Sequence, residues 1–446
     1  MAETLSLPGG AEAAPILRPD AATLRRAVIA SVIGNGLEWF DFLIYGFFAS
    51  VIADVFFPAQ NQQLSLILTF ATFGVGFVVR PLGGILIGVY ADHAGRQKAL
   101  SMLILLMAFG TVALGLTPGY ARIGLAAPLI VVFARVLQGL SVGGEFASAT
   151  AMLVEYAPPG KRYFFAAFQM CAQSFAVALA SGFGFVLAAT LTPAALHAWG
   201  WRLPFLLGGL VGPVGFYIRR KVGDAPEFLE WQRRRPKTLR APVREVLFGH
   251  PGAVLCAIGT IVCGTAATYL WNSYLPVYVV KTLHLPLAAP LLGAAICGAI
   301  NMGVNPLAGM LADRIGPYRV FFPAVIASGL LAYPMFAFVI AHPSRDNLFA
   351  VQLLATLMLG FMAGPIPGLL GGLFATPIRS TGMAISYNVS VTLFGGLAPL
   401  TITWLTGLTA SRFIPAYYLG AAALLSLILV GLFRPAPRPM AARQAA

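Results

Sequence analysis

The chain has 446 residues, of which 59% are hydrophobic and only 10% are charged, whereas roughly a quarter of the residues in soluble domains are charged. This composition excludes a soluble globular protein of this length and predicts membrane-spanning helices, each about 20 residues long. The net charge of +14 does not indicate a nucleic-acid partner, because the basic residues are spread over loops that we place at one membrane face.

Twelve apolar segments follow one another and predict an all-α integral membrane protein. They lie at about 27–53, 64–89, 98–117, 127–153, 165–190, 202–221, 252–280, 288–311, 320–341, 347–374, 381–406 and 413–434. A long polar stretch separates the sixth segment from the seventh. The division that we predict is a disordered cytoplasmic N-terminus (1–22), a six-helix bundle (23–221), a cytoplasmic linker (222–250), a second six-helix bundle (251–434) and a cytoplasmic tail (435–446).

Lysine and arginine predict the orientation. They gather in the termini and in alternate loops, and the remaining loops hold only Arg122, Lys281, Arg345 and Arg412. Since cytoplasmic loops carry an excess of basic residues, we expect both termini in the cytoplasm. Residues 1–22 do not resemble a cleaved signal, because Arg25 and Arg26 lead directly into a full-length span.

Charges within the first, second and fourth spans are the strongest indication of function. They are Glu38, Asp41, Arg80, Arg135 and Glu145. Each costs about 2.5–3.5 kcal/mol at the bilayer centre on insertion scales, so they should face one another or a watery cavity. Burial and a neighbouring arginine shift a carboxyl pKa in opposite directions, so an acid in this set can exchange a proton. The alternative is a buried ion network that only joins the three spans.

The second half has no clear charge at mid-membrane and offers hydrogen-bonding and aromatic side chains instead. Its candidates for substrate binding are Tyr269, Asn272, Asn301, Tyr387 and Asn388, and span five of the first half adds Gln169 and Gln173 near Arg80. The alternative for each is a hydrogen bond between helices. In span ten, four glycines at a spacing of four, Gly360 to Gly372, accompany Pro365 and Pro367. They predict close helix packing or a bending gate helix.

One pattern occurs twice, as Gly88, Asp92, Gly95 and as Gly309, Asp313, Gly316, and each equivalent pair is 221 residues apart. Internal duplication is typical of secondary transporters. We expect the charges of the two turns to form a gate at the cytoplasmic mouth, together with basic residues of neighbouring inner loops. This set is Asp92, Arg96, Asp313, Arg314, Arg162 and Arg379.

The four cysteines lack metal-ligand spacing, so neither a metal site nor a cofactor is expected.

The chain resembles the major facilitator superfamily and, within it, the metabolite:proton symporters. The resemblance rests on the repeated turn, in which His93 and Pro317 replace usual arginines, and on six stretches. These are GNGLEWFDFLIYGF (34–47), VRPLGG (79–84), RVLQGLSVGGEF (135–146), LVEYAPPGKR (153–162), WGWRLPFLLG (199–208) and IPAYYL (414–419).

This resemblance implies two pseudo-symmetric six-helix bundles and proton-driven import by alternating access. It assigns proton coupling to Asp41 and Arg135, and Glu38, Arg80 and Glu145 fall on the family's own motifs. Arg80 and Arg135 are also candidates for substrate binding, because a guanidinium pairs bidentately with a carboxylate. A di- or tricarboxylate such as citrate or tricarballylate is the first expected substrate. A zwitterionic solute such as proline or betaine, or a cyclic acid such as shikimate, is the alternative.

A proton-coupled drug antiporter is the rival of a different class. An enzyme is disfavoured, because the sequence holds no nucleophile–base set, metal motif or nucleotide loop. The expected partners are a small organic anion, a proton and the lipid bilayer. We expect a monomer in the bacterial cytoplasmic membrane.

Overall fold

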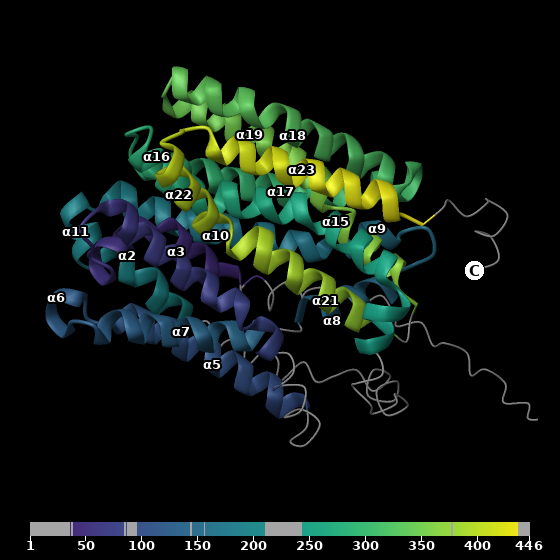
Figure 1. Cartoon of the computed structure of the whole chain (residues 1–446), viewed down its shortest axis with the longest axis horizontal. Coiled ribbons are helices and arrows are strands. Elements are labelled where there is room, and N and C mark those ends of the chain that lie inside the picture. The colour runs from purple at the N-terminus through teal and green to yellow at the C-terminus, as the bar shows by residue number, and fades with distance from the viewer. Residues whose placement is uncertain are drawn as a thin grey trace, which may run out of the picture.

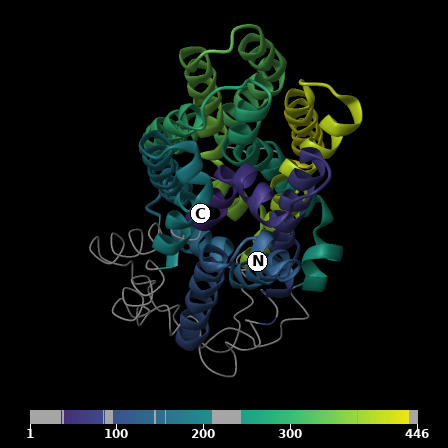
Figure 2. The ribbon, with the colours of Figure 1, turned by 90° about the vertical axis from the view of Figure 1, so that its left-hand side faces the viewer.

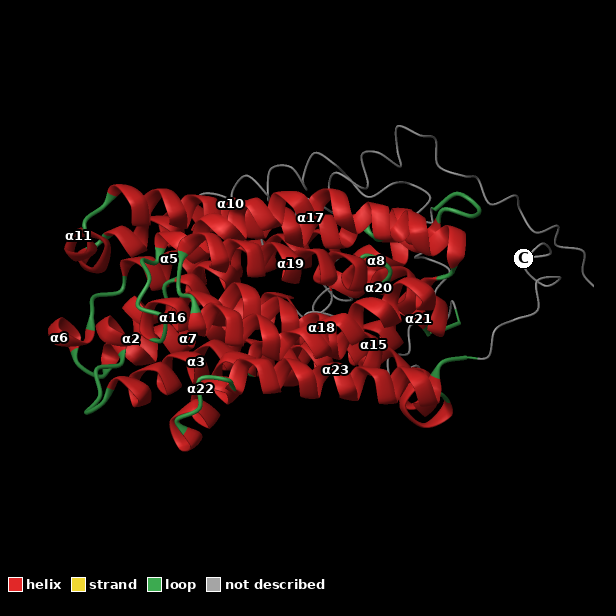
Figure 3. Cartoon of the chain, turned by 90° about the horizontal axis from the view of Figure 1, so that it is seen from above, coloured by secondary structure: helices red, strands yellow, loops and turns green. Residues whose placement is uncertain are grey.

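The computed structural model describes residues 36, 39–83, 86, 96–142, 145–155, 157–209, 243–375 and 378–435. Within these ranges the regular structure is entirely helical (Figure 3). An all-helical chain suits a bilayer, because a helix pairs its backbone N–H and C=O groups within the segment. Predicted site residues Glu38 and Asp92 lie outside the described residues, and so does most of the predicted linker.

The first half contains nine labelled α-helices and one further helix at its start. In chain order the helices are Trp39–Phe47, α2 (Ala49–Phe56), α3 (Gln62–Val78), α5 (Arg96–Leu116), α6 (Tyr120–Ile123), α7 (Ala126–Val142), α8 (Glu145–Glu155), α9 (Arg162–Ala166), α10 (Phe168–Thr190) and α11 (Pro193–Ala198), followed by a 3-10 turn (Gly200–Arg202).

The second half is built from long helices, three of them interrupted. Its elements are a π turn (Glu245–Gly249), α15 (Pro251–Tyr269), a π turn (Leu270–Tyr274), α16 (Leu275–Lys281), α17 (Ala288–Ile315), α18 (Pro317–Ala341), α19 (Arg345–Ala363), α20 (Ile366–Leu373), α21 (Arg379–Val391), a π turn (Thr392–Gly396), α22 (Ala398–Thr409) and α23 (Ile414–Phe433).

Eight helices in the described ranges are long and apolar enough to cross a membrane, or nine if one bent pair is counted as a span. Two shorter apolar helices, Leu105–Leu116 and Ala126–Val142, lie where the third and fourth spans are predicted. The predicted sixth span, 202–221, is described only as far as residue 209.

The helices run along the long axis of the molecule. Figure 1 places α6, α11 and α16 at one end and α8, α9 and α21 at the other. By the distribution of basic residues, the first is the predicted outer end and the second is the predicted cytoplasmic end. Seen from the outer end in Figure 2, most second-half helices (green to yellow) lie above the first-half helices (purple to blue).

The interruptions of the first and tenth spans have different causes. The first span is bent by 70° between Trp39–Phe47 and Ala49–Phe56, although the sequence predicts one continuous helix. Just before the bend, a Cβ on Gly46 would lie 2.8 Å from the Ser273 Cβ, so glycine permits close contact with span seven. The break between α19 and α20 confirms the interruption predicted at Pro365, which has no N–H to continue the helix.

Candidate functional site

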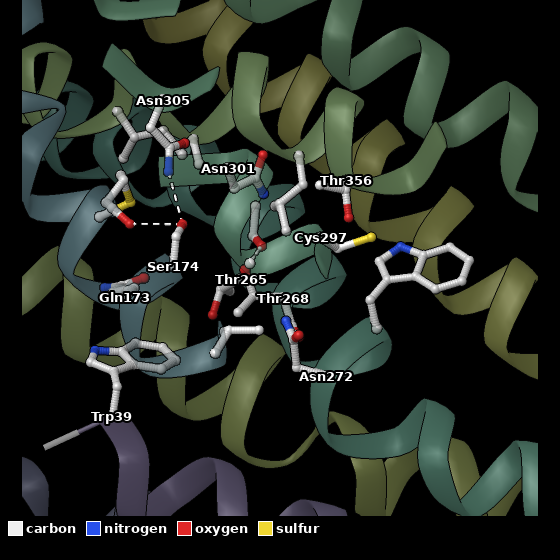
Figure 4. A pocket seen from close by; sticks show the side chains of 18 of the residues that line it. Trp39, Gln173, Ser174, Thr265, Thr268, Asn272, Cys297, Asn301, Asn305 and Thr356 are labelled. Atoms are coloured by element: carbon white, nitrogen blue, oxygen red, sulfur yellow. Dashed lines mark hydrogen bonds between the residues drawn. The ribbon is translucent and has the colours of Figure 1, made fainter. Parts of the chain in front are cut away.

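A cavity lies between the two halves near the middle of the spans (Figure 4). Its empty volume is about 900 Å³, including the part open to solvent. The side chains that line it carry no formal charge. The polar and aromatic ones are Trp39, Phe146, Gln173, Ser174, Thr265, Thr268, Trp271, Asn272, Asn301, Asn305, Thr356 and Tyr387.

Hydrogen bonds fix some of these polar groups and leave others open. Asn305 Nδ2 donates to Ser174 Oγ at 3.0 Å, which joins α17 to α10 across the halves (Figure 4). Asn272 Nδ2 donates to the Thr268 carbonyl at 2.9 Å. The Asn301 Oδ1 atom is buried and has no hydrogen-bond partner among the described residues. An unpaired buried acceptor in a cavity wall is suited to a donor on a bound molecule.

Aromatic rings form much of the remaining wall. Phe146 and Tyr387, one from each half, stack with ring centroids 3.7 Å apart and planes 7° apart. Trp271 stacks on Phe336, with ring centroids 5.4 Å apart. These rings give the cavity flat apolar faces and the negative π clouds that attract cations.

The buried charges of the first half lie beside the cavity but do not line it. Asp41, Arg80 and Arg135 are 4%, 3% and 0% exposed. A series of aromatic contacts leads from the cavity to Arg80. The ring centroids of Trp39 and Tyr269 lie 5.7 Å apart, and those of Tyr269 and Phe77 lie 5.3 Å apart. The Arg80 Cζ atom lies 4.1 Å from the Phe77 ring centroid. Aromatic side chains therefore separate the charged groups from the cavity.

Both arginines rest on aromatic faces. The Arg135 Cζ atom lies 3.9 Å from the Tyr45 ring centroid. Both arginines also contact the Phe42 ring, whose centroid lies 4.7 Å from Arg80 Cζ and 5.8 Å from Arg135 Cζ. The three side-chain nitrogens of Arg135 are buried and have no hydrogen-bond partner in the described chain. Cation–π contact offsets part of the cost of burying these guanidinium groups, and the Arg135 N–H donors have no partner among the described residues.

Asp41 is held by a neutral partner. Its Oδ2 atom accepts a hydrogen bond from Thr111 Oγ1 of α5, while Oδ1 has no partner among the described residues. No ion pair within 4 Å joins Asp41 to Arg135 in the described part of the chain. Gln138 Nε2 of α7 in turn donates to Thr111 Oγ1 at 2.8 Å. The sequence did not predict that Thr111 and Gln138 belong to this hydrogen-bond network.

At the predicted cytoplasmic end, Asp313 binds the start of a helix in the other half. Its two carboxylate oxygens each accept a backbone N–H, from Tyr163 and from Phe164, both at 2.9 Å. These are among the first amides of α9, where free N–H groups and the helix dipole favour an anion. Arg162 lies close by, with Nη2 3.2 Å from the position that a Cβ on Gly371 would occupy.

The predicted outer end is also closed by contacts between the halves. Gln63 Nε2 near the start of α3 donates to the Thr403 carbonyl of α22. Deeper in the same span, Thr392 Oγ1 donates to the Phe77 carbonyl at 3.1 Å. Contacts therefore join the halves at the predicted cytoplasmic end and at the predicted outer end.

The structure brings together only some of the predicted substrate residues. Gln173, Asn272, Asn301 and Tyr387 line the cavity. Five others are buried but are not among its lining residues: Arg80, Arg135, Gln169, Tyr269 and Asn388.

The predicted charges at the helix ends are described unevenly. Glu145 begins α8 and Arg96 begins α5, but their side chains lie outside the described set, as Glu38 and Asp92 do entirely. Arg314 is exposed at the end of α17, and Arg379 begins α21 at the predicted cytoplasmic end.

Several lining residues were not predicted. Trp39, Phe146, Thr265, Thr268 and Thr356 carry no charge and lie in apolar segments. Such residues are ordinary in a buried helix, so their sequence positions alone do not distinguish a cavity wall from helix packing. Trp39 and Phe146 fall within stretches that carry the family resemblance, and that was the available signal.

Comparison with known proteins identifies the relationships of the chain. Residues 31–364 match the family described as Major Facilitator Superfamily. The chain is 35% identical over 402 residues to the citrate-proton symporter of Klebsiella pneumoniae, covering 90% of both chains. It is 34% identical over 425 residues to the glycine betaine/proline/ectoine/pipecolic acid transporter OusA of Dickeya dadantii, covering 93% of this chain and 84% of the relative.

Solved structures of low sequence identity share the fold. The xylose transporter XylE from E. coli, in a partially occluded inward open conformation, matches with a TM-score of 0.74 at 17% identity, covering 93% of this chain and 100% of that chain. A bacterial homologue of the human lysosomal transporter Spinster matches with a TM-score of 0.63 at 17% identity, over 94% of this chain and 100% of that chain. The predicted membrane fold with two helix bundles is thereby confirmed.

Proposed function

Because this chain belongs to the major facilitator superfamily, we propose that it is a proton-coupled symporter that imports a small organic acid by alternating access. The first substrate class is a di- or tricarboxylate such as citrate or tricarballylate. The observation that carries the proposal is the pairing of a central cavity with a buried carboxyl group, Asp41, beside the unpaired guanidinium of Arg135. The similarity to citrate-proton symporters over 90% of the chain supports the same class.

The roles of the charged residues follow from their surroundings. Asp41 carries the exchangeable proton, and the Arg135 charge favours release of that proton. Arg80 and Arg135 supply the forked N–H donors that pair with carboxylates. For a carboxylate in the cavity to reach them, the aromatic contacts through Trp39 and Tyr269 have to open.

The test is uptake of labelled citrate into proteoliposomes with an imposed proton gradient. Wild-type protein accumulates citrate above equilibrium, and a protonophore abolishes that accumulation. Asp41→Asn loses accumulation and retains exchange, since it cannot carry the proton. The control is Asp54→Asn, which alters an exposed acid paired with His197 at 3.4 Å and leaves accumulation unchanged. Accumulation in Asp41→Asn that still depends on pH would remove Asp41 from the coupling step.

A zwitterionic compatible solute is the second candidate, and the cavity lining favours it. The lining carries no formal charge and presents Trp39, Phe146, Trp271 and Tyr387, whose faces suit a quaternary ammonium group. The putative proline/betaine transporter of Staphylococcus aureus is 33% identical over 92% of this chain and 88% of its own length.

A thermal-shift panel on purified protein separates the two classes. A ligand at 100 times its Kd stabilises the protein by about 2.7 kcal/mol. We expect a clear shift with citrate or tricarballylate and none with proline or glycine betaine; the reverse result selects the zwitterion. A shift with shikimate alone selects the cyclic acids.

The remaining assignments belong to the same proposal. The carrier functions as a monomer in a bacterial cytoplasmic membrane, with both termini inside and the two bundles divided at the linker 222–250. Asp92, Arg96, Asp313, Arg314, Arg162 and Arg379 form the cytoplasmic gate. The contact between Asp313 and the first amides of α9 supports this role for Asp313.

A further inference from the structure

We propose that Thr111 is the positioning residue of the proton site, where its hydroxyl group is hydrogen-bonded to the Asp41 carboxyl group in both protonation states. The inference rests on the proposed proton exchange at Asp41. It adds a third helix, α5, to the pair of spans that carry Asp41 and Arg135.

The Thr111 side chain is completely buried between three helices. Its Oγ1 atom donates to Asp41 Oδ2, lies 2.9 Å from the Met107 carbonyl oxygen one turn earlier, and accepts from Gln138 Nε2 at 2.8 Å. A hydroxyl group has one proton and two lone pairs. Thr111 therefore has two possible acceptors, Asp41 and the Met107 carbonyl, for a single proton.

The protonation state of Asp41 determines which acceptor is used. When the carboxyl group is ionised, the hydroxyl proton points to it, because a hydrogen bond to a charged acceptor is the stronger one. When Asp41 binds a proton from the aqueous phase, its new O–H donates to Thr111 Oγ1. The hydroxyl proton then turns to the Met107 carbonyl, a common bond for threonine in helices. Thr111 keeps its own proton throughout.

Gln138 holds the hydroxyl oxygen in place in both states. Its side chain is completely buried, and its amide occupies one lone pair of Thr111 Oγ1, leaving the second for Asp41. Donation from Gln138 also polarises the hydroxyl group and strengthens its bond to the carboxylate, because linked hydrogen bonds reinforce one another.

The other groups around Asp41 do not replace this bond. Among the described residues, Arg135 of α7 is a nearby charge, without an ion pair to Asp41. Arg80 of span two lies over Phe42 and Phe77, and Tyr45 of span one donates to the Thr69 carbonyl at 3.0 Å. The segment after the 3-10 turn presents Gly208, where a Cβ would lie 2.6 Å from Asp41 Oδ1.

The experiment is infrared difference spectroscopy of the purified protein in lipid, in which the C=O band of a protonated carboxyl group is titrated against pH. The band assigned to Asp41 is the one lost in Asp41→Asn. In Thr111→Val its midpoint moves to higher pH by about one unit, the scale expected when one hydrogen bond to a charged group is lost. The direction follows because that bond favours the ionised form. The band also changes frequency, since the protonated carboxyl group loses its acceptor.

Matched variants separate positioning from packing. Thr111→Ser keeps the hydroxyl group and restores the wild-type midpoint. Thr117→Val removes a hydroxyl group that bonds only the Ala113 carbonyl, at 2.5 Å, and leaves the midpoint unchanged. If Thr111→Val does not fold, Gln138→Met takes its place, with a smaller shift in the same direction.

An unchanged midpoint and frequency in the folded variant overturn the proposal. If no carboxyl band is lost in Asp41→Asn, the proposal is overturned together with the assignment of the proton to Asp41. If the band shifts as expected while proteoliposomes couple no substrate to protons, the role of Thr111 stands and the proposed symport fails.

Discussion

Arg80 and Arg135 are buried guanidinium groups that rest on rings rather than on carboxylates. Removing a charge from water is costly, and contact with an aromatic face returns up to about 2 kcal/mol when the pair is desolvated. Arg135 completes none of its possible hydrogen bonds among the described residues, and Arg80 Nε is also unpaired there. A carboxylate that displaced an aromatic neighbour would find oriented donors already free of water.

Arg80→Lys is the sharpest test of this arrangement at the residue scale. Lysine keeps the charge but loses the planar fork and the stacking on Phe77, so substrate affinity should fall about tenfold or more. The measurement is isothermal titration with the ligand found in the thermal-shift panel. Arg122→Lys, on the predicted outer loop, is the control and should bind as wild type. Unchanged affinity in Arg80→Lys, with only a mild effect of Arg80→Ala, would make Arg80 a structural residue.

The charged members of the site could be predicted from the sequence, and their neutral partners could not. Asp41, Arg80 and Arg135 stand out because an ionised group in an apolar segment needs a functional or structural reason. Thr111 does not, because a single threonine can bond its own helix backbone anywhere in a span. Only the packing of α5 against span one turns its hydroxyl group toward Asp41.

At the scale of elements, the first backbone amides of the α9–α10 span donate hydrogen bonds to a carboxylate of the other half. Asp313 accepts two backbone amides of α9, and an anion at a helix N-terminus is worth about 0.3–1 kcal/mol when exposed and up to about 2 kcal/mol when partly buried. The sequence identified Asp313 through the repeated turn. The partner of Asp313 was not predictable, because every residue except proline has a backbone N–H, and the sequence does not show which of them bonds Asp313.

Asp313→Asn should weaken this contact by about 1–2 kcal/mol, because it removes the charge and one acceptor. The predicted cytoplasmic end then opens more often, while substrate affinity changes little. Spin labels at Pro159 and Arg319 measure the separation of the halves there. Asp346→Asn is the control, since Asp346 lies in the first turn of α19 within its own half. A distance distribution like that of wild type, together with lost binding, would place Asp313 in the substrate site.

Interruptions of the helices were predictable only where the covalent chemistry demands them. Pro365 lacks an N–H and separates α19 from α20. The 70° bend at Phe48 follows no proline, and the close contact of Gly46 with Ser273 arises from tertiary packing. The π turn at Leu270–Tyr274 comes just before Pro276, whose missing N–H likewise interrupts the hydrogen bonds of a regular helix.

At the scale of the whole molecule, the two halves meet at both ends of one cavity. Gln63 contacts the Thr403 carbonyl at the predicted outer end, and Asp313 contacts α9 at the predicted cytoplasmic end. Under the proposed alternating access, only one end opens at a time. We therefore expect the relative strengths of the two contacts to set the balance between outward-open and inward-open forms.

Combining Gln63→Ala with Asp313→Asn should bring that balance closer to wild type than either change alone. The sites are at opposite ends and share no partner, so their effects on the free energy should add with opposite signs. The measurement pairs the cytoplasmic labels with labels at Gln60 and Thr409 across the outer end. Distances in the double variant that follow one single variant would show that the two contacts do not act on the same equilibrium.

The bond between Asp313 and α9 also joins two segments that are synthesised at different times. Asp313 follows Phe164 by 149 residues in the chain, so span five leaves the ribosome long before its acceptor exists. The start of the fifth span therefore acquires this partner only after the eighth span has been synthesised.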